Sequence, residues 1–190
     1  MICAVVLAAG SSRRMGSQKL LLPWAGKTVI EQIVDQLLRS RVYRIYIVTG
    51  HDHERLVQTL HKYPVELVYN EGYSAGMLSS VRCGITALPA TYTGVLIALG
   101  DQPWLRTQTV NTLIDHFLAH PKIVLPVHQN RRGHPLLFAR QYSDRILNHY
   151  DSVGLRGLLQ EYAQDVQEVP IDSEGVLLDL DVPEDYLKGQ

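Results

Sequence analysis

The sequence lacks several features that would quickly define a class of protein. Its 190 residues include only two cysteines, Cys3 and Cys83, so a disulfide framework is excluded and a reducing, cytoplasmic setting is expected. Neither sign of charge is in excess, because 18 Lys and Arg residues face 19 Asp and Glu residues. That balance predicts no binding to nucleic acid or to an anionic membrane through a global electric field.

Long hydrophobic runs are also missing. The apolar segment at residues 2–9 is too short to span a membrane, which takes ~20 residues, and no basic stretch precedes it as in a signal peptide. No charge run, low-complexity tract or internal repeat suggests a linker. With 46% hydrophobic residues, the chain predicts one domain over residues 1–190 with a sizeable core.

Two common nucleotide-binding fingerprints are absent as well. A G-x-G-x-x-G loop that starts at Gly10 needs a glycine at position 12, where Ser12 stands. The Gly-Lys-Thr triplet at residues 26–28 resembles the end of a Walker-type loop, but the leading glycine would fall on Leu21. The sequence therefore supports neither a dinucleotide-dependent hydride enzyme nor a P-loop ATPase.

What the sequence does contain is a loop suited to phosphate. The apolar run at 2–9 leads directly into small, hydroxylated and cationic residues, namely Gly10, Ser11, Ser12, Arg13, Arg14, Gly16, Ser17 and Lys19. Backbone N–H groups can converge in such a loop, and cationic side chains can reach the same point. The pattern favours a polyanionic ligand, for which a nucleoside triphosphate is the best candidate.

Apolar runs of strand length alternate with helical periodicity along the chain. The strand patterns cover residues 2–9, 45–49, 65–69, 95–99 and 123–126, and the helical patterns cover 29–39, 54–62, 78–87, 110–119 and 154–162. This alternation predicts an α/β fold with a parallel sheet. Thr28 and Glu31 predict a capping box on the first helix. Because ligands bind at the carboxyl ends of strands in such sheets, the loop after Gly10 and the turn at 100–101 should share one edge.

Acidic residues at two places indicate a metal ion. Asp101 directly follows an apolar strand pattern, where it can bind Mg²⁺ together with substrate phosphates or cap the turn before Pro103. Asp179 and Asp181 follow strand-like residues at 176–178, and alternation in an extended segment places both on one face. The local sequence also favours a second interpretation, in which Asp181 caps the terminal helix.

Segments spread along the whole chain resemble the MobA-like nucleotidyltransferases, and among them the molybdenum cofactor cytidylyltransferases. The matching segments are residues 7–23, 76–82, 100–103, 132–135 and 178–185. Val182 departs from the threonine expected in the family, but no ligand role is implied for that position. The resemblance implies a three-layer α/β/α, Rossmann-like nucleotidyltransferase fold with a mostly parallel sheet.

The resemblance also implies a reaction. CMP from CTP is joined to the phosphate of molybdopterin, and pyrophosphate is released. Lys19, Arg14 and Asp101 would be the catalytic residues, and Asp101 with Asp181 or Asp179 would hold Mg²⁺. The implied partners are CTP or GTP, molybdopterin, and a molybdenum hydroxylase or its maturation factor.

Nucleotide contacts are implied for the first loop and for a later helix start. The residues concerned are Leu7, Ala8, Ala9, Gly10, Ser11, Ser12, Arg13, Gly16, Lys19, Ser79 and Ser80. Ala9 stands where guanosine-using relatives are expected to have glycine, so CTP is the expected nucleotide, and Gln18 is a second candidate for base choice. Ser79 and Ser80 can instead, or also, supply a hydroxyl cap to their helix.

By the same resemblance, the acceptor would be bound by Arg132, Gly133, His134 and Pro135, although a His-Pro pair equally fits an ordinary turn. His51 and His53 lack a companion pair at ligand spacing, which favours a loop and helix start over a metal site.

Two other functions stay open. One is a nucleotidyltransferase with a different acceptor, such as a sugar phosphate. The other is a non-catalytic protein that binds nucleotide or cofactor and passes it to a partner enzyme.

Overall fold

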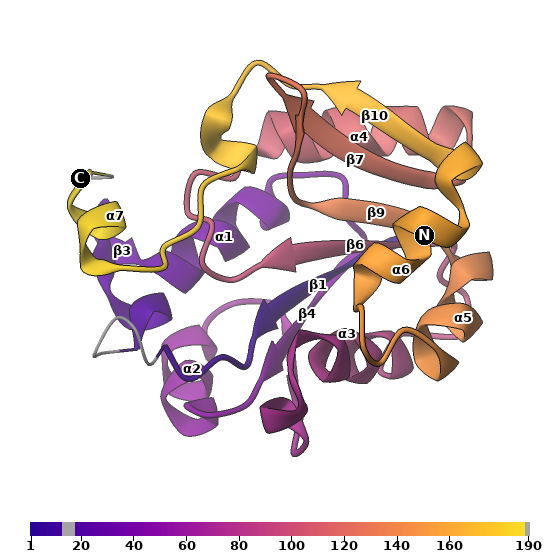
Figure 1. Cartoon of the computed structure of the whole chain (residues 1–190). Helices are drawn as coiled ribbons and strands as arrows, with labels where there is room; N and C mark the ends of the chain where they lie inside the picture. The colour runs from indigo at the N-terminus through magenta and orange to yellow at the C-terminus, as the bar shows by residue number, and fades with distance from the viewer. Residues whose placement is uncertain (13–17, 189–190) are drawn as a thin grey trace.

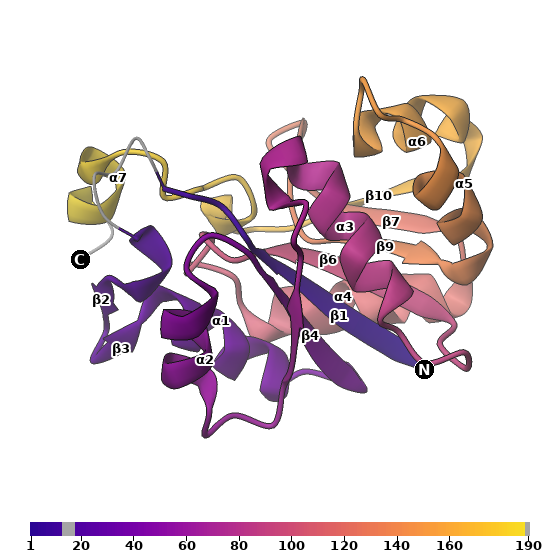
Figure 2. The same cartoon turned by 90° about the horizontal axis from the view of Figure 1, so that it is seen from below.

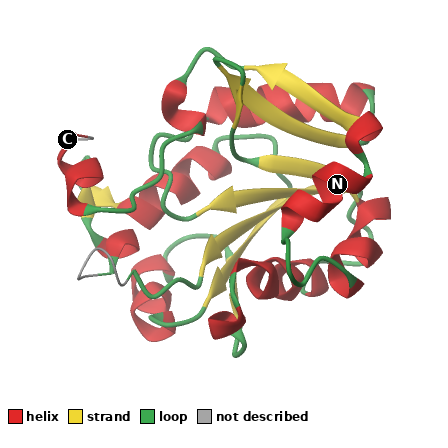
Figure 3. Ribbon diagram, in the orientation of Figure 1, coloured by secondary structure: helices red, strands yellow, loops and turns green. Residues whose placement is uncertain are grey.

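A mostly parallel sheet forms the centre of the molecule (Figure 1, Figure 3), of which the computed structural model describes residues 1–12 and 18–188. The sheet is made of β1 (Ile2–Ala8), β4 (Arg44–Thr49), β5 (Glu66–Tyr69), β6 (Gly94–Leu99), β7 (Ile123–His128), β8 (Arg131–Arg132), β9 (Leu136–Ala139) and β10 (Val166–Pro170). Its spatial order is β10-β7-β9-β6-β1-β4-β5, with β8 paired to β7. A separate two-stranded ribbon consists of β2 (Pro23–Trp24) and β3 (Lys27–Thr28).

Strand direction identifies the fold class. β1 pairs in parallel with both β4 and β6, β4 with β5, and β7 with β10. Strand β9 runs antiparallel between β6 and β7, and β8 is antiparallel to β7. The predicted α/β fold is therefore confirmed, with antiparallel strands that the sequence patterns had not predicted.

Helices cover both faces of this sheet (Figure 2). They are α1 (Val29–Leu38), α2 (His53–Leu60), α3 (Met77–Thr86), α4 (Thr107–Ala119), α5 (Ser143–Asn148), α6 (Leu155–Glu161) and α7 (Pro183–Lys188). Helix α3 packs against β1 and β4 on one face with α5 beside it, whereas α1 and α4 contact each other on the other face. This is the expected three-layer, Rossmann-like arrangement. No helix of the described residues has the length and apolar content that crossing a bilayer requires.

The core explains why these elements form. Five of the seven residues of β1 are fully or almost fully shielded on both faces, which is typical of a strand between two helical layers. The apolar face of α1, which includes Ile30 and Ile33, is completely buried. The capping box at its start is confirmed, because Thr28 Oγ1 accepts from the Glu31 N–H and the Glu31 carboxylate accepts from the Thr28 N–H.

Close packing of α3 on the sheet depends on Gly84. A Cβ atom added at this glycine would lie 2.3 Å from Cγ1 of Val5. The absence of a side chain thus lets the helix axis approach β1.

The strand-like interpretation of residues 176–178 is wrong. Residues Glu174–Val176 form a 3-10 helix, because the Ser173 hydroxyl accepts a hydrogen bond from the Gly175 N–H and turns the chain. Strand β9 went unpredicted because its four residues are all buried and show no alternation. Strand β10 lies at the edge of the sheet, and Val169 is its only buried residue among the five. Its sequence therefore lacks the alternation of apolar and polar residues that would identify a strand.

Candidate functional site

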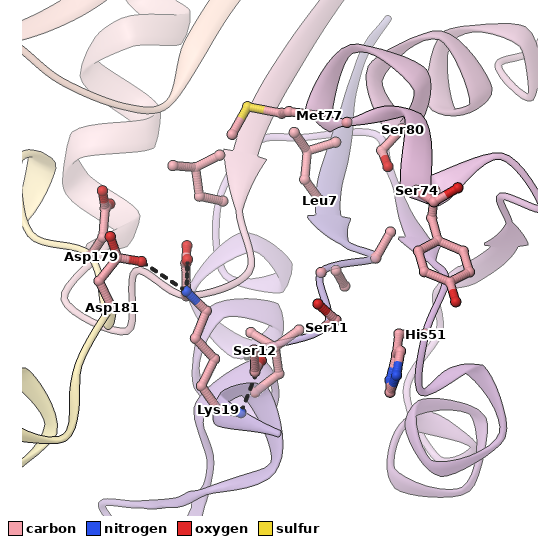
Figure 4. A pocket seen from close by; sticks show the side chains of 18 residues that line it. Leu7, Ser11, Ser12, Lys19, His51, Ser74, Met77, Ser80, Asp179 and Asp181 are labelled. Carbon is pink, nitrogen blue, oxygen red and sulfur yellow. Dashed lines mark hydrogen bonds and ion pairs between the residues drawn. The ribbon is translucent and has the colours of Figure 1, made fainter. Parts of the chain in front are cut away.

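A pocket of about 650 Å³ opens at the carboxyl ends of β1 and β6 (Figure 4). The loop after β1, the turn after β6, the start of α3 and the segment before α7 all contribute to its wall. This is the edge of a parallel sheet at which ligands bind. The structure therefore brings together chain segments for which the sequence predicted only a common edge of the sheet.

Many predicted site residues line this pocket. They are Leu7, Ala8, Ala9, Gly10, Ser11, Ser12, Lys19, Ser80, Asp101, Asp179 and Asp181. The predicted residues Arg13, Arg14 and Gly16 lie outside the part of the chain that the structure describes. Ser79, Arg132, Gly133, His134 and Pro135 do not line the pocket.

Two glycines allow the strand ends to come close together beneath the pocket. A Cβ atom on Gly50, after β4, would lie 2.8 Å from the carbonyl oxygen of Ala9. A Cβ atom on Gly100, after β6, would lie 2.7 Å from the carbonyl oxygen of Leu7. Both positions therefore exclude larger residues, and Gly100 holds the following Asp101 at the pocket edge.

The acidic end of the pocket is built around Lys19. Its Nζ lies 2.5 Å from Oδ2 of Asp101 and 3.2 Å from Oδ1 of Asp181. The backbone N–H of Leu180 donates to the carbonyl oxygen of Asp101 at 3.0 Å, and the Leu180 side chain is fully buried. Asp179 and Asp181 thus both reach the pocket on either side of a buried leucine, as the alternation predicted.

Two titratable side chains beside this cluster, Asp179 and His134, have lost part of their hydration. Asp179 keeps contact with solvent, yet loss of water around its carboxyl group raises the pKa above the ordinary value, although Gln102 Nε2 donates to it at 2.6 Å. Burial lowers the pKa of His134, against the opposing influence of Asp179 and Asp101. Desolvation thus disfavours the charged form of both the His134 ring and the Asp179 carboxyl group.

The carboxylates fit a divalent cation that is shared with a ligand. Asp101, Asp179 and Asp181 offer the oxygen donors that hard cations prefer. Within residues 1–12 and 18–188, no three His, Cys, Asp or Glu side chains are grouped so that they could hold a metal ion by themselves. Such a donor set fits a divalent cation whose coordination is completed by waters and by substrate phosphates.

The predicted acceptor segment is used mainly for packing. Arg132 is exposed and its Nε donates to Oε1 of Glu168 at 2.6 Å, away from the pocket lining. Gly133 packs so closely on Val176 that a Cβ atom would lie 2.2 Å from the Val176 carbonyl oxygen. Within this segment, His134 interacts electrostatically with Asp179 and Asp101 at the acidic end of the pocket.

The serines of α3 do not cap their helix as proposed. The N-cap residue is Gly76, and no side chain caps this end. Ser79 Oγ instead donates to the Gly76 carbonyl oxygen, and Asn70 Nδ2 donates to Ser79 Oγ and Ser80 Oγ at 3.0 Å each. Ser80 is almost completely buried beneath the pocket wall.

Sequence reasoning did not name several further pocket residues as site residues. They are Leu20, His51, Tyr73, Ser74, Gly76, Met77 and Leu99. Apart from Leu20 and Leu99, they lie after β4 or β5, so the carboxyl-end rule applied to every parallel strand would have found them. The prediction that His51 and His53 belong to a loop and helix start is confirmed, since α2 begins at His53.

The fold and the pocket are those of an enzyme class that binds nucleotides and transfers nucleotidyl groups. The chain belongs to the MobA-like NTP transferase domain family, which matches residues 4–166. It is therefore a nucleotidyltransferase by family.

Relatives over the full length support this assignment. The chain is 27% identical to the molybdenum cofactor cytidylyltransferase of Escherichia coli over 190 residues, which cover 98% of this chain and 94% of that protein. It is similar in structure to Rv0371c from Mycobacterium tuberculosis, with a TM-score of 0.88, 27% identity, and coverage of 98% of this chain and 95% of that one. Rv0371c has also been solved in complex with manganese, at a TM-score of 0.84, 25% identity, and coverage of 99% and 97%, which fits a divalent metal requirement in the family.

Proposed function

We propose that this enzyme transfers CMP from CTP to the phosphate of molybdopterin and releases pyrophosphate, with Mg²⁺ as the metal. The observation that carries the proposal is the position of Lys19, which links the phosphate-type loop to the two acidic segments across one pocket. The full-length relationship to a molybdenum cofactor cytidylyltransferase supports the choice of acceptor.

The transfer needs charge neutralisation and alignment rather than a side-chain base. An oxygen of the acceptor phosphate attacks the α-phosphorus of CTP, and the bond from that phosphorus to the oxygen of pyrophosphate breaks. The attacking phosphate is already ionised, so no proton has to be removed. Lys19, together with Arg14, provides positive charge near the phosphates of CTP.

Asp101 with Asp181 or Asp179 would hold Mg²⁺. The bound ion supplies charge neutralisation for phosphate oxygens. Lys19 contacts Asp101 and Asp181. A triphosphate that binds beside these carboxylates would therefore meet both the ammonium group of Lys19 and the metal ion. Two carboxylates face a single ammonium group, so the cluster keeps negative charge that a bound cation can neutralise.

The choice of base and the choice of acceptor would depend on different residues. Ala9, buried beside Gly10, favours CTP over GTP in this family, and GTP is the alternative nucleotide. His134 is the member of the 132–135 segment best placed for the acceptor, because Asp179 and Asp101 both act on its ring. The product, molybdopterin joined to CMP, would serve a molybdenum hydroxylase or its maturation factor in the cytoplasm.

The decisive experiment measures pyrophosphate release from CTP and from GTP, with molybdenum-loaded molybdopterin as acceptor and with Mg²⁺ present or chelated. Release from CTP alone supports the proposal. Release from GTP overturns the interpretation of Ala9, and release only with sugar phosphates overturns the acceptor.

Asp101→Asn provides the residue test for the same reaction. The amide keeps the shape of the side chain and leaves the backbone bond from Leu180 in place, but it removes a charged metal ligand. Turnover should fall by ~10² or more, in line with the loss of one charged group aimed at a transition state, while the thermal unfolding curve is unchanged. Normal turnover would contradict the metal role of Asp101, and triphosphate binding without any turnover in the unmodified protein would favour a non-catalytic binding protein.

A further inference from the structure

A chain of hydrogen bonds connects the phosphate-type loop to the far wall of the pocket. Ser12 Oγ donates to Gln18 Oε1 at 2.7 Å, and Gln18 Nε2 donates to Asp52 Oδ2 at 2.7 Å. His51 Nδ1 lies 2.9 Å from the same Asp52 oxygen. The Lys19 N–H donates to Ser12 Oγ at 3.3 Å, so the chain ends beside the lysine of the acidic cluster.

Asp52 is diverted from its expected role to take part in this chain. It occupies the N-cap position of α2, where an Asp side chain normally accepts from the first-turn N–H groups. Here it makes no such cap bond and accepts from Gln18 and His51 instead. Burial acts to raise the pKa of Asp52, but the hydrogen bonds from His51 and Gln18, together with the charges of His51 and Arg55, lower the pKa below the ordinary value.

The carboxylate sets the direction of every bond in the chain. An ionised carboxylate only accepts hydrogen bonds, so Gln18 must present its amide NH₂ to Asp52 and its carbonyl oxygen to Ser12. For the same reason, His51 Nδ1 must carry the proton that faces Asp52. In the neutral ring, Nε2 then has a free lone pair and acts as an acceptor.

His51 lies on the pocket wall away from the carboxylates. It lines the pocket with Tyr73 and Ser74, at the end opposite the acidic cluster (Figure 4). Its ring contacts the Tyr73 ring edge-on, with centroids 6.2 Å apart, and its side chain is half exposed. If the triphosphate occupies the loop and the carboxylates, the base extends toward this wall.

We propose that His51 Nε2 accepts a hydrogen bond from the exocyclic amino group of the bound base and so selects cytosine over uracil. Asp52 and Gln18 act as positioning residues that hold the ring in the accepting tautomer. Uracil presents a carbonyl oxygen at the corresponding position, and two acceptors would then face each other. The inference rests on the proposed function, because it takes a cytidine nucleotide as the ligand of this pocket.

The test measures dissociation constants of CTP and UTP by calorimetry in the presence of Mg²⁺. The unmodified protein should bind CTP about tenfold more tightly than UTP, the size expected for one neutral hydrogen bond made or lost. His51→Ala should weaken CTP binding about fivefold to tenfold with little effect on UTP, which brings the ratio close to one. Asp52→Asn should also lower the preference for CTP over UTP. An amide offers both a donor and an acceptor, so it can pair with either tautomer of the His51 ring.

His61→Ala is the matched control. This histidine lies at the other end of α2, is exposed, and does not line the pocket. It should leave both dissociation constants unchanged. Thermal unfolding of all variants verifies that they fold.

The outcomes separate this inference from the proposed function. An unchanged CTP to UTP ratio in His51→Ala, with pyrophosphate release from CTP intact, overturns the role of His51 and leaves the proposed reaction standing. A protein that binds neither CTP nor UTP overturns both. Weaker binding of CTP and UTP by the same factor would make His51 a general contact and would also overturn the selective role.

Discussion

At the scale of single residues, Lys19 has the most demanding environment. Its side chain is only 15% exposed and contacts carboxylates that lie 82 and 162 positions further along the chain. A lysine in such a place is held by opposite charges and has lost much of its water. A bound triphosphate offers the ammonium group new partners, so Lys19 connects substrate binding to the acidic cluster.

Replacement of Lys19 by alanine should lower kcat/KM for CTP by about 10² to 10³, because a preorganised cation near the transferring phosphate is lost. Steady-state pyrophosphate release measures the change. Lys122→Ala is the control, since Lys122 makes an exposed ion pair with Asp165 far from the pocket lining, and such pairs contribute little. Equal kinetics for Lys19→Ala and the unmodified enzyme would make this lysine a structural partner of Asp101 only.

At the scale of elements, the approach of α3 to the sheet determines the pocket wall. Gly84 on this helix faces Val5 of β1 and Val48 of β4, without room for a methyl group. Gly76, Met77 and Ser80 at the start of the same helix line the pocket. A shift of α3 therefore changes stability and site geometry together.

Gly84→Ala tests this packing because two effects oppose each other. Alanine favours an isolated helix by up to ~1 kcal/mol, but an overpacked core costs ~1–3 kcal/mol. With the added Cβ atom 2.3 Å from Val5, we expect the variant to lose about 1–2 kcal/mol of unfolding free energy in urea titrations. Thr86→Ala, on the exposed side of the same helix, should stay within about 0.5 kcal/mol. A Gly84→Ala protein as stable as the parent would refute the close contact.

Tyr63 connects the segment before β5 to α1, and it makes the free energy of unfolding depend on pH in the alkaline range. Burial, with the nearby charges of Glu31 and Asp35, raises its pKa from 10.0 to about 12. The folded state favours the neutral phenol of Tyr63. The contribution of Tyr63 to the free energy of unfolding is therefore complete below pH 10 and is lost as the pH rises through about 12.

Tyr63→Phe should therefore flatten the fall of unfolding free energy between pH 10 and pH 12. Chemical denaturation at several pH values in that window measures the slope. Tyr43→Phe is the comparison, because Tyr43 is 55% exposed and should leave the slope unchanged. Parallel slopes for Tyr63→Phe and the parent would contradict the coupling of Tyr63 to Glu31.

At the scale of the whole molecule, the last segment of the chain completes the pocket. Leu180 is buried and bonded to Asp101, and the Tyr186 hydroxyl of α7 donates to the Pro23 carbonyl oxygen of the β2–β3 ribbon at 2.5 Å. Trp24 of this ribbon contacts both Trp104 and Tyr186. Asp179 and Asp181 are thus held between the sheet and the ribbon.

Ligand binding across these segments should stabilise the entire fold. CTP with Mg²⁺ at 100 times its dissociation constant adds about 2.7 kcal/mol, which for a chain of this size raises the melting temperature by about 5–10 °C. Scanning calorimetry with and without a chelator measures the shift, and Lys19→Ala should show a smaller one. An equal shift with and without the metal would contradict the shared cation site.

The sequence by itself determined the parts that depend on neighbours along the chain. The order of strands β1, β4, β5, β6 and β7, the Thr28–Glu31 capping box and the phosphate-type loop follow from hydrophobic period and local hydrogen bonding, whereas β9 and β10 do not. The placement of Asp101 at the pocket edge follows as well, because the strand pattern ends at Leu99, and Gly100 and Asp101 come directly after it, at the carboxyl end of the strand.

Only the tertiary structure decided which of the candidate residues meet. It joined Lys19 to Asp101 and Asp181, turned Arg132 toward Glu168, and linked Gln18 to Asp52 across 34 positions. These contacts are set by how helices and sheet pack, and the local sequence around an arginine or a glutamine is the same whichever way its side chain turns. The chemistry of the loop is therefore local, whereas the geometry of the site comes from long-range packing.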